Sequence, residues 1–248
     1  MISIEELSEI RERKKTNLYY EEKEYLQYIF LNAISRYQDS FVFKGGTCLR
    51  ICFGFERASE DLDFSANLKV NKLKEMVYKC LKDFELLNLE SKIYSEKEFQ
   101  GNLRFEIRFK GPLFQSSARS TNTLKIDFNK RKVKNKTVKI VQKLFSDVPM
   151  FSIVVLDERE ILAEKIRALI NRAESRDLYD IWMLLNKGIK IDKKLLSIKL
   201  KEGKSKFSNL KLPSKEEYER DLRNLIKVVP SYEQVKKEVS EAFHKIKN

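Results

Sequence analysis

The sequence predicts an α+β fold, in which a mixed β-sheet with flanking helices precedes a C-terminal helical bundle. The first observation is the alternation of apolar and charged residues over 102–110 and 122–128, which is the period of a half-buried strand. The second is the helical spacing of apolar residues over 70–88 and through the C-terminal third of the chain. We therefore place an α/β domain with N-terminal helices over 1–155 and a helical domain over 156–248.

Short apolar runs separated by turns define the first part of the chain. In order, we expect helices over 2–15 and 20–38, a strand over 41–44, a helix over 47–54, a strand over 61–64 and a helix over 70–88. In the helices, apolar residues recur at intervals of three and four. The strands are short runs that end at turn residues, and Gly45-Gly46 ends the first of them.

Alternation defines the middle of the chain, and helical periodicity defines the rest. In order, we expect strands over 91–95, 102–110 and 122–128, a hairpin around Asn135 over 132–140, a strand over 150–156, and helices over 157–172, 176–187, 214–228 and 231–246. The stretch 188–212 is basic and weakly patterned.

Charge and composition narrow the function classes. The chain has 50 Lys and Arg against 37 Asp and Glu, a net charge of +13, which favours polyanionic partners unless the lysines only solvate the surface. One histidine and three cysteines argue against a zinc site and against histidine catalysis. No apolar run is long enough to span a membrane, and the N-terminus carries acids where a signal peptide is apolar. We expect a cytoplasmic protein.

Gly45, Gly46 and Thr47 form the first candidate site, between a strand and a helix. Glycines let the backbone approach an anion, and a helix N-terminus presents N–H groups and the positive end of the helix dipole. Such an arrangement can hold phosphate, although a Gly-Gly turn is more often only a turn.

Three carboxylates form the second candidate site. Asp61 and Asp63 flank Leu62 on one strand, and a period of two puts both on one face. Asp127 lies on the polar face of a later strand. Neighbouring acids repel unless a cation separates them, and carboxylate oxygens suit Mg²⁺ or Mn²⁺. We expect all three to be metal ligands, with solvated strand-end acids as the alternative.

The order of these elements resembles the core of the DNA-polymerase-β-like nucleotidyltransferase superfamily. KGGTCLR, DLDF and IDF stand where that superfamily has a Gly-Gly or Gly-Ser turn, an Asp-x-Asp or Asp-x-Glu strand and a later lone Asp. Thr47 replaces the serine of many members and keeps the hydroxyl. The resemblance implies a nucleotidyltransferase-type sheet and a metal-dependent transfer of NMP from an NTP, with Mg²⁺ or Mn²⁺ as cofactor.

A closer resemblance is to the AbiEii/AbiGii toxin family, the nucleotidyltransferase half of type IV toxin–antitoxin pairs. It rests on FKGGTCLRICFGFERASEDLDFS and, downstream, on EKIRAL at 164–169 and SRDLYDIWML at 175–184, so it covers roughly residues 40–186. It implies a toxin whose activity arrests growth, and a separately encoded antitoxin that counters it without a stable complex.

The downstream motif adds Lys165 to the candidate site. From the residues alone we favour packing between helices, with Lys165 paired to Asp177 or Arg176 to Asp180. The resemblance instead favours Lys165 as a phosphate ligand, because a lysine can extend its stem past apolar surface to a triphosphate. Arg176, Asp177 and Asp180 would then support the active site.

These observations define the expected site. We expect catalytic roles for Asp61, Asp63, Asp127 (also as the general base) and Lys165. We expect nucleotide contacts from Lys44, Gly45, Gly46, Thr47, Arg50, Lys165 and Asp177. For Arg57, a surface salt bridge with Glu56 or Glu60 is as plausible as a phosphate contact.

The acceptor is expected to be RNA, such as a tRNA 3′ end, or a protein hydroxyl. Six lysines and arginines between 130 and 139 follow Asp127 directly, and with Lys199, Lys201, Lys204 and Lys206 they form either an RNA track or a solvated surface. The alternative function is a non-catalytic nucleic-acid-binding module that retains the fold, but such a module needs no three acids near bound phosphates. A small-molecule nucleotidyltransferase would need an acidic pocket for a cationic substrate, which the basic surroundings do not support.

Overall fold

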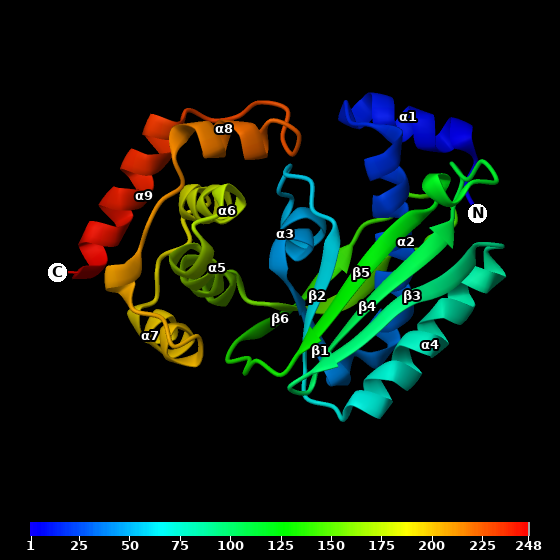
Figure 1. Ribbon diagram of the computed structural model, residues 1–248, viewed down its shortest axis with the longest axis horizontal. Coiled ribbons are helices and arrows are strands. Elements are labelled where there is room, and N and C mark those ends of the chain that lie inside the picture. Colours follow the sequence, from blue (N-terminus) through cyan, green and yellow to red (C-terminus); the bar gives the residue numbers. More distant parts are fainter. Residues whose placement is uncertain (248) are drawn as a thin grey trace. The chain divides into compact units, whose positions relative to one another are not determined.

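The computed structural model describes residues 1–247, with side chains as far as residue 245, and the chain divides into two compact units (Figure 1). The first unit comprises Met1–Gly54 and Ala58–Val155, and the second comprises Phe55–Arg57 and the chain from Leu156 onward. Three residues that the sequence places in the α/β part therefore belong to the second unit. That each unit is an independent domain stays a prediction.

A mixed sheet forms the centre of the first unit. Within residues 1–247 its strands are β1 (Phe41–Lys44), β2 (Asp61–Ala66), β3 (Glu90–Phe99), β4 (Asn102–Lys110), β5 (Asn122–Asn129), β6 (Lys136–Val141) and β7 (Phe151–Leu156). Their order across the sheet is β3-β4-β5-β2-β1-β7-β6. The pairs β2/β5 and β1/β7 are parallel, whereas β1/β2, β3/β4 and β4/β5 are antiparallel. The predicted α+β class with a mixed sheet is confirmed.

The helices of the first unit are α1 (Ile4–Lys14), α2 (Leu18–Ile34), α3 (Gly45–Phe53) and α4 (Val70–Leu86). Helices α2 and α4 cover the same face of the sheet (Figure 1). Phe30 of α2 packs against Phe64 of β2, and Phe84 of α4 packs 4.5 Å from Phe109 of β4, measured between ring centroids. The apolar sides of the alternating strands therefore face these two helices.

Phe64 lies at the centre of this apolar layer. Its ring stacks on Phe128 of β5 at 5.1 Å with an interplanar angle of 18°, and it also contacts Phe41 and Phe43 of β1. All four rings are buried. Because Phe64 and Phe128 directly follow Asp63 and Asp127, the same packing that anchors the rings fixes the backbone of the candidate carboxylates.

The second unit is helical. Its helices are α5 (Glu158–Arg172), α6 (Ser175–Asn186), α7 (Lys193–Glu202), α8 (Lys215–Leu222) and α9 (Tyr232–Lys247). Ala173 adopts a left-handed conformation (φ 51°) and separates α5 from α6. None of the helices in the described residues combines the length and the hydropathy that a membrane crossing requires.

Two sequence predictions were wrong. The hairpin around Asn135 is absent from the described chain, because only Lys136–Val141 forms a strand and the residues before it have no regular structure. Lys199, expected at the surface as part of an RNA track or of a solvated face, is fully buried in α7, a helix within the stretch that showed little pattern. Its ammonium group lies 2.7 Å from Glu160 and 3.2 Å from Glu164 of α5, so this lysine ties two helices together.

Candidate active site

Gly45 begins α3 in a conformation that requires glycine. Its φ is +82°, and the side chain of Lys44, the N-cap residue, makes no capping hydrogen bond. A Cβ at residue 45 would collide with the carboxylate of Asp63. The absence of a side chain therefore lets the N-terminus of α3 approach that carboxylate closely.

The three predicted carboxylates lie on neighbouring strands. Asp63 of β2 is in register with Asp127 of β5, the next strand, and neighbouring strands are about 4.8 Å apart. Asp61 precedes Asp63 by two residues, so both side chains lie on one face of β2, while Leu62 and Phe64 are buried on the other. The structure thus places Asp61, Asp63 and Asp127 on the same polar face of two neighbouring strands, with Asp63 beside the start of α3.

Arg104 of β4 is a neighbour of this cluster that the sequence analysis missed. It is in register with Asp127, and its guanidinium donates to both carboxylate oxygens at 2.7 and 3.0 Å. These hydrogen bonds, with the charge of Asp127, raise the pKa of Arg104. No group of three or more acidic, histidine or cysteine side chains in the described chain is gathered closely enough to hold a metal ion. The metal assignment stays a prediction.

Two polar side chains donate hydrogen bonds to main-chain carbonyls at the start of β2. The Thr47 hydroxyl is fully buried, lies 3.0 Å from the Ser59 hydroxyl and donates to the main-chain carbonyl of Asp61 at 2.6 Å. Gln27 of α2 donates to the carbonyls of Ser59 and Glu60 at 3.1 and 3.0 Å. Thr47 therefore joins α3 to the carboxylate strand. Its predicted contact with a nucleotide is untested.

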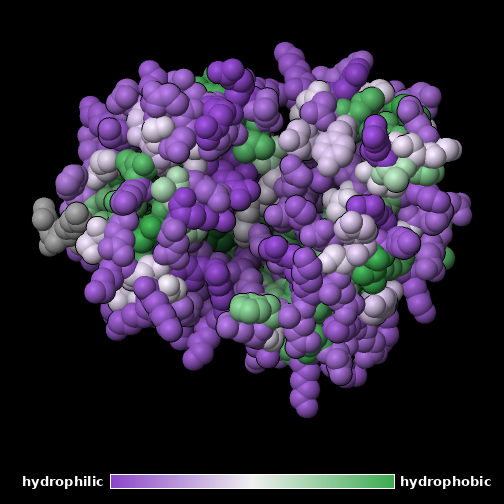
Figure 2. Space-filling model, in the orientation of Figure 1, coloured by the Kyte–Doolittle hydropathy of each residue, from purple (hydrophilic) through white to green (hydrophobic). Residues whose placement is uncertain are grey.

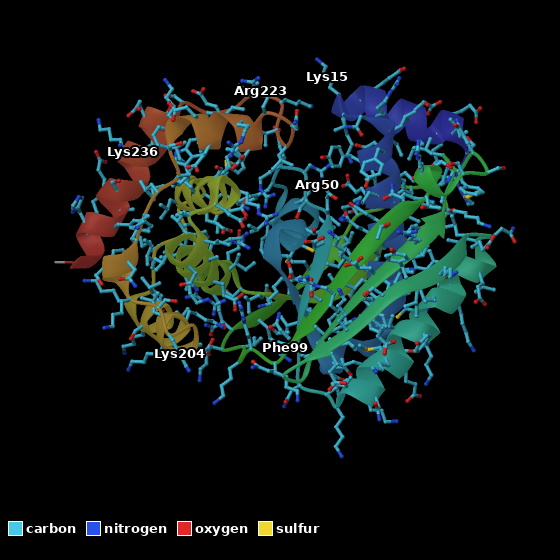
Figure 3. All side chains as sticks on the ribbon, in the orientation of Figure 1. Lys15, Arg50, Phe99, Lys204, Arg223 and Lys236 are labelled. Carbon is cyan, nitrogen blue, oxygen red and sulfur yellow. The ribbon has the colours of Figure 1, made fainter. Side chains whose placement is uncertain are left out.

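Arg50 and Lys44 also make contacts within the first unit. Arg50 of α3, labelled in Figure 3, donates to Glu24 of α2 at 2.7 Å. Lys14 of α1 pairs with the same carboxylate at 2.6 Å. Lys44 of β1 is buried and is in register with Asp63 of β2. The roles of Lys44 and Arg50 in nucleotide binding stay predictions.

The downstream motif forms a buried ion network in the second unit. Lys165 of α5 lies 3.1 Å from Asp177 and 2.7 Å from Asp180, both on α6. Arg57 donates to both oxygens of Asp180 at 2.9 Å, and Arg172 donates to Asp177 at 2.7 and 3.0 Å. The expected pairing of Lys165 with Asp177 is observed. Arg57 is buried rather than at the surface, and it reaches Asp180, a residue more than 120 positions away.

The network holds both aspartates ionised. Burial by itself would raise the pKa of Asp177 and of Asp180, but the neighbouring cations outweigh it and lower both values. Burial would likewise lower the pKa of Lys165 and of Arg57, and the aspartates raise both. The roles of Lys165 and Asp177 in nucleotide binding are not tested by these contacts, since an ion network of this kind also arises from packing alone.

Comparison with solved structures supports the fold. The chain is similar to the nucleotidyltransferase toxin MenT4 of Mycobacterium tuberculosis H37Rv, with a TM-score of 0.72 and 19% identity over 98% of this chain and 89% of that one. It is also similar to JHP933 of Helicobacter pylori, with a TM-score of 0.60 and 18% identity over 93% of each chain. A putative nucleotidyltransferase of Helicobacter pylori gives a TM-score of 0.57 at 19% identity, over 90% of this chain and 92% of that one.

Sequence comparison supplies the family. No curated protein matches this sequence significantly. The family model of nucleotidyltransferase AbiEii toxins of type IV toxin–antitoxin systems matches residues 29–243, which include the glycine turn, the three carboxylates and the buried ion network. Because the match spans most of the chain, the protein belongs to the AbiEii family of type IV toxin–antitoxin systems and is a nucleotidyltransferase.

Proposed function

We propose that the protein transfers NMP from an NTP to the 3′ hydroxyl of an RNA, in a reaction that depends on a divalent metal. We propose further that it acts in the cytoplasm as a toxin that a separately encoded antitoxin counters. The observation that carries the chemistry is the alignment of Asp63 with Asp127 on adjacent parallel strands, with Asp61 on the same face and Gly45 against Asp63.

Phosphate binding is assigned to the start of α3. The first N–H groups of a helix lack intrahelical partners, and the dipole favours an anion at this end. The Lys44 side chain does not cap the helix, and the glycine at residue 45 removes the Cβ from this approach. The main-chain N–H groups near Gly45 and Gly46 would therefore hold the phosphates of the NTP.

Metal binding is assigned to Asp61, Asp63 and Asp127. Their oxygen atoms match the ligand preference of Mg²⁺ and Mn²⁺, and Asp127 fits once its carboxylate leaves Arg104. The chemistry that a bound Mg²⁺ or Mn²⁺ supplies is neutralisation of the phosphate charge and stabilisation of the departing pyrophosphate.

The transfer itself needs one proton acceptor. The 3′ oxygen of the RNA attacks the α-phosphorus, the bond from that phosphorus to the pyrophosphate oxygen breaks, and pyrophosphate leaves. The hydroxyl proton passes to a carboxylate oxygen of Asp127. Orientation of the two substrates, rather than covalent chemistry by the protein, supplies most of the acceleration in phosphoryl transfers of this type.

An RNA acceptor is favoured over a protein hydroxyl by charge. The net charge of +13 and the basic segment after Asp127 suit a polyanion, which releases counterions on binding. The binding-only alternative has no use for three acids on one face beside the start of α3, because they would repel a nucleic acid.

The test is incubation of the protein with each α-³²P-labelled NTP, Mg²⁺, total cellular RNA and total cellular protein. We expect label in an RNA band, and at least a hundredfold less label with Asp63→Asn or with Asp127→Asn. Asp39→Asn, at an exposed aspartate outside the cluster, is the matched control and should keep full activity. Label in a protein band would refute the RNA acceptor, and unchanged transfer by Asp63→Asn would refute the metal assignment.

Lys165 needs a separate test, because its role is predicted from the family motif. We propose that Lys165→Met weakens NTP binding, measured by isothermal titration calorimetry. A thermal melt of the same variant reports the structural cost of removing the ammonium from Asp177 and Asp180. Unchanged NTP affinity together with a lowered melting temperature would assign Lys165 to the structure alone.

A further inference from the structure

The polar face of strands β3, β4 and β5 is a surface that the proposed chemistry does not yet use. Helices α2 and α4 pack on the opposite, apolar face of these strands. On the polar side, Lys97 of β3 is in register with Arg104 of β4, and Arg104 with Asp127 of β5. With Asp63 of β2, these residues form one row across the sheet. At about 4.8 Å per strand, Lys97 is roughly 10 Å from Asp127.

Two exposed aromatic side chains lie on this polar face of β3. A β-bulge between Ile93 and Ser95 inserts Tyr94, and such a bulge re-aims a side chain. Tyr94 is 58% exposed and the Arg108 guanidinium lies 3.5 Å above its ring centroid, which places the ring on the Arg108 side of the sheet.

Phe99, at the end of β3, is the second aromatic. It follows Lys97 by two residues and therefore shares its face. It is 69% exposed, and Figure 3 shows its position on the ribbon.

The charge of this face is positive. Lys92, Lys97 and Lys125 are exposed, and none of the three forms an ion pair within the described chain. The acids on the same face of these three strands are Glu90, which pairs with Lys110 at the far end of the strands, Glu106, and Asp127, which pairs with Arg104. Hydrophilic residues also dominate the face of the molecule visible in Figure 2. The combination of cations with exposed rings is what single-stranded nucleic acid requires of a binding surface.

We propose that this face binds the unpaired 3′ end of the RNA acceptor. We call it the acceptor platform and define it by Lys92, Tyr94, Lys97, Phe99, Arg108 and Lys125. Bases stack on Tyr94 and Phe99, and the lysines contact the phosphates. The inference rests on the proposed function, since it assumes that the acceptor is RNA. A strand lying along the row toward β5 and β2 brings its terminal hydroxyl to Asp127.

The geometry favours a single strand over a duplex or a protein. An aromatic ring stacks on a base only when the base is unpaired, and in other proteins exposed aromatic rings on a β-sheet stack successive bases of a single strand. In a duplex the faces of the bases are covered by neighbouring base pairs, so Tyr94 and Phe99 would have no base to stack on. A protein acceptor would not make binding depend steeply on salt, whereas phosphate contacts do.

The first test measures RNA binding by fluorescence anisotropy without NTP, which separates it from catalysis. The probes are short single-stranded RNAs of mixed sequence and a blunt RNA duplex of equal length. We expect the double variant Tyr94→Ala/Phe99→Ala to bind the single strands at least about fivefold more weakly, as for loss of a stacked base, and the duplex unchanged. The control is Tyr19→Ala, which removes an exposed aromatic ring from α2, on the opposite side of the sheet, and should bind normally.

The second test uses charge. Lys97→Glu should weaken binding to the single strands and reduce the slope of log affinity against log salt, because one phosphate contact is lost. Lys82→Glu, at an exposed lysine of α4, makes the same charge change away from the platform. Equal affinity and equal slope for the two variants would overturn the platform.

The two proposals fail in different ways. Loss of label transfer in Asp63→Asn, with normal RNA binding by the Tyr94→Ala/Phe99→Ala double variant, would refute the platform and leave the proposed function standing. Label on a protein band would refute the RNA acceptor and the platform with it. Weaker binding of both the single strands and the duplex by that double variant would also refute the platform, because stacking on unpaired bases would not explain it.

Discussion

Asp180→Asn is expected to destabilise the second unit severely. Asp180 is 1% exposed and contacts two cations, with Arg57 at 2.9 Å through both oxygens and Lys165 at 2.7 Å. Asparagine keeps the shape of the side chain but leaves these buried cations with less compensation. Breaking a buried ion pair by removing one partner costs about 3–5 kcal/mol, so we expect a loss in this range. For a chain of this size, it corresponds to a fall in melting temperature of about 6–20 °C.

The assay is thermal unfolding followed by circular dichroism and calorimetry, with two comparisons. Asp221→Asn removes the charge that pairs with exposed Arg220 but keeps an oxygen that can accept from the Ser175 hydroxyl, and should cost at most about 1 kcal/mol. The double variant Arg57→Met/Asp180→Leu removes cation and anion together and should cost less than Asp180→Asn alone. A melting temperature for Asp180→Asn within the range of the Asp221 control would refute the argument, and so would a double variant that is destabilised as much as Asp180→Asn or more.

The same network makes stability depend on acidity. Since Asp177 and Asp180 have folded-state pKa values below the ordinary value of about 3.9, their contribution is complete above that value and is lost as the pH falls below it. The free energy of unfolding should therefore drop below about pH 4. Asp180→Asn should show a shallower drop, because one of the two groups no longer titrates. An equally steep drop in that variant would show that other carboxylates cause it.

Three further predictions concern the first unit. Gly45→Ala should lower the free energy of unfolding by about 1–3 kcal/mol because φ is positive, and by more because the new Cβ would collide with Asp63. The same variant should bind NTP more weakly. Normal stability in urea unfolding would contradict the strain. Arg104→Met should release Asp127 and tighten Mn²⁺ binding by up to about fivefold, the value of an exposed pair, in a titration followed by electron paramagnetic resonance without NTP; weaker binding would contradict the release. Cys80, whose pKa burial raises to about 12, should resist iodoacetamide at pH 8 until the chain is unfolded, and rapid labelling of the native protein would disprove its protection.

Sequence patterns predicted most elements of the first unit, although not the single strand β6, because local signals there are strong. The alternation of apolar and charged residues predicted β4 with its observed bounds, 102 and 110, and the glycine turn predicted the junction of β1 and α3. The pairing of Asp127 with Arg104 was not predicted, although alternation places both on polar faces. A long loop over 111–121 separates their strands, and a loop of that length does not determine the register.

Contacts between distant parts of the chain were the least predictable. The pairing of Arg57 with Asp180 depends on the packing of the second unit, which no local period encodes. Lys199 was expected at the surface because lysine is rarely buried, but glutamates of α5 compensate its charge. Helix α7 was missed for the same reason, since its buried positions include a charged residue.

Because Phe55–Arg57 belongs to the second unit, a fragment that begins at Leu156 lacks part of that unit. A polypeptide that starts at Leu156 contains every helix of the second unit but omits the guanidinium that faces Asp180, as well as the Phe55 ring, which lies 5.5 Å from the Lys187 ammonium. Severed after residue 155, the C-terminal fragment would carry a buried carboxylate with only part of its counter-charge, and recombinant expression of it alone should give poorly folded material. A fusion that carries residues 55–57 on a flexible tether ahead of Leu156 is the repair that this topology suggests.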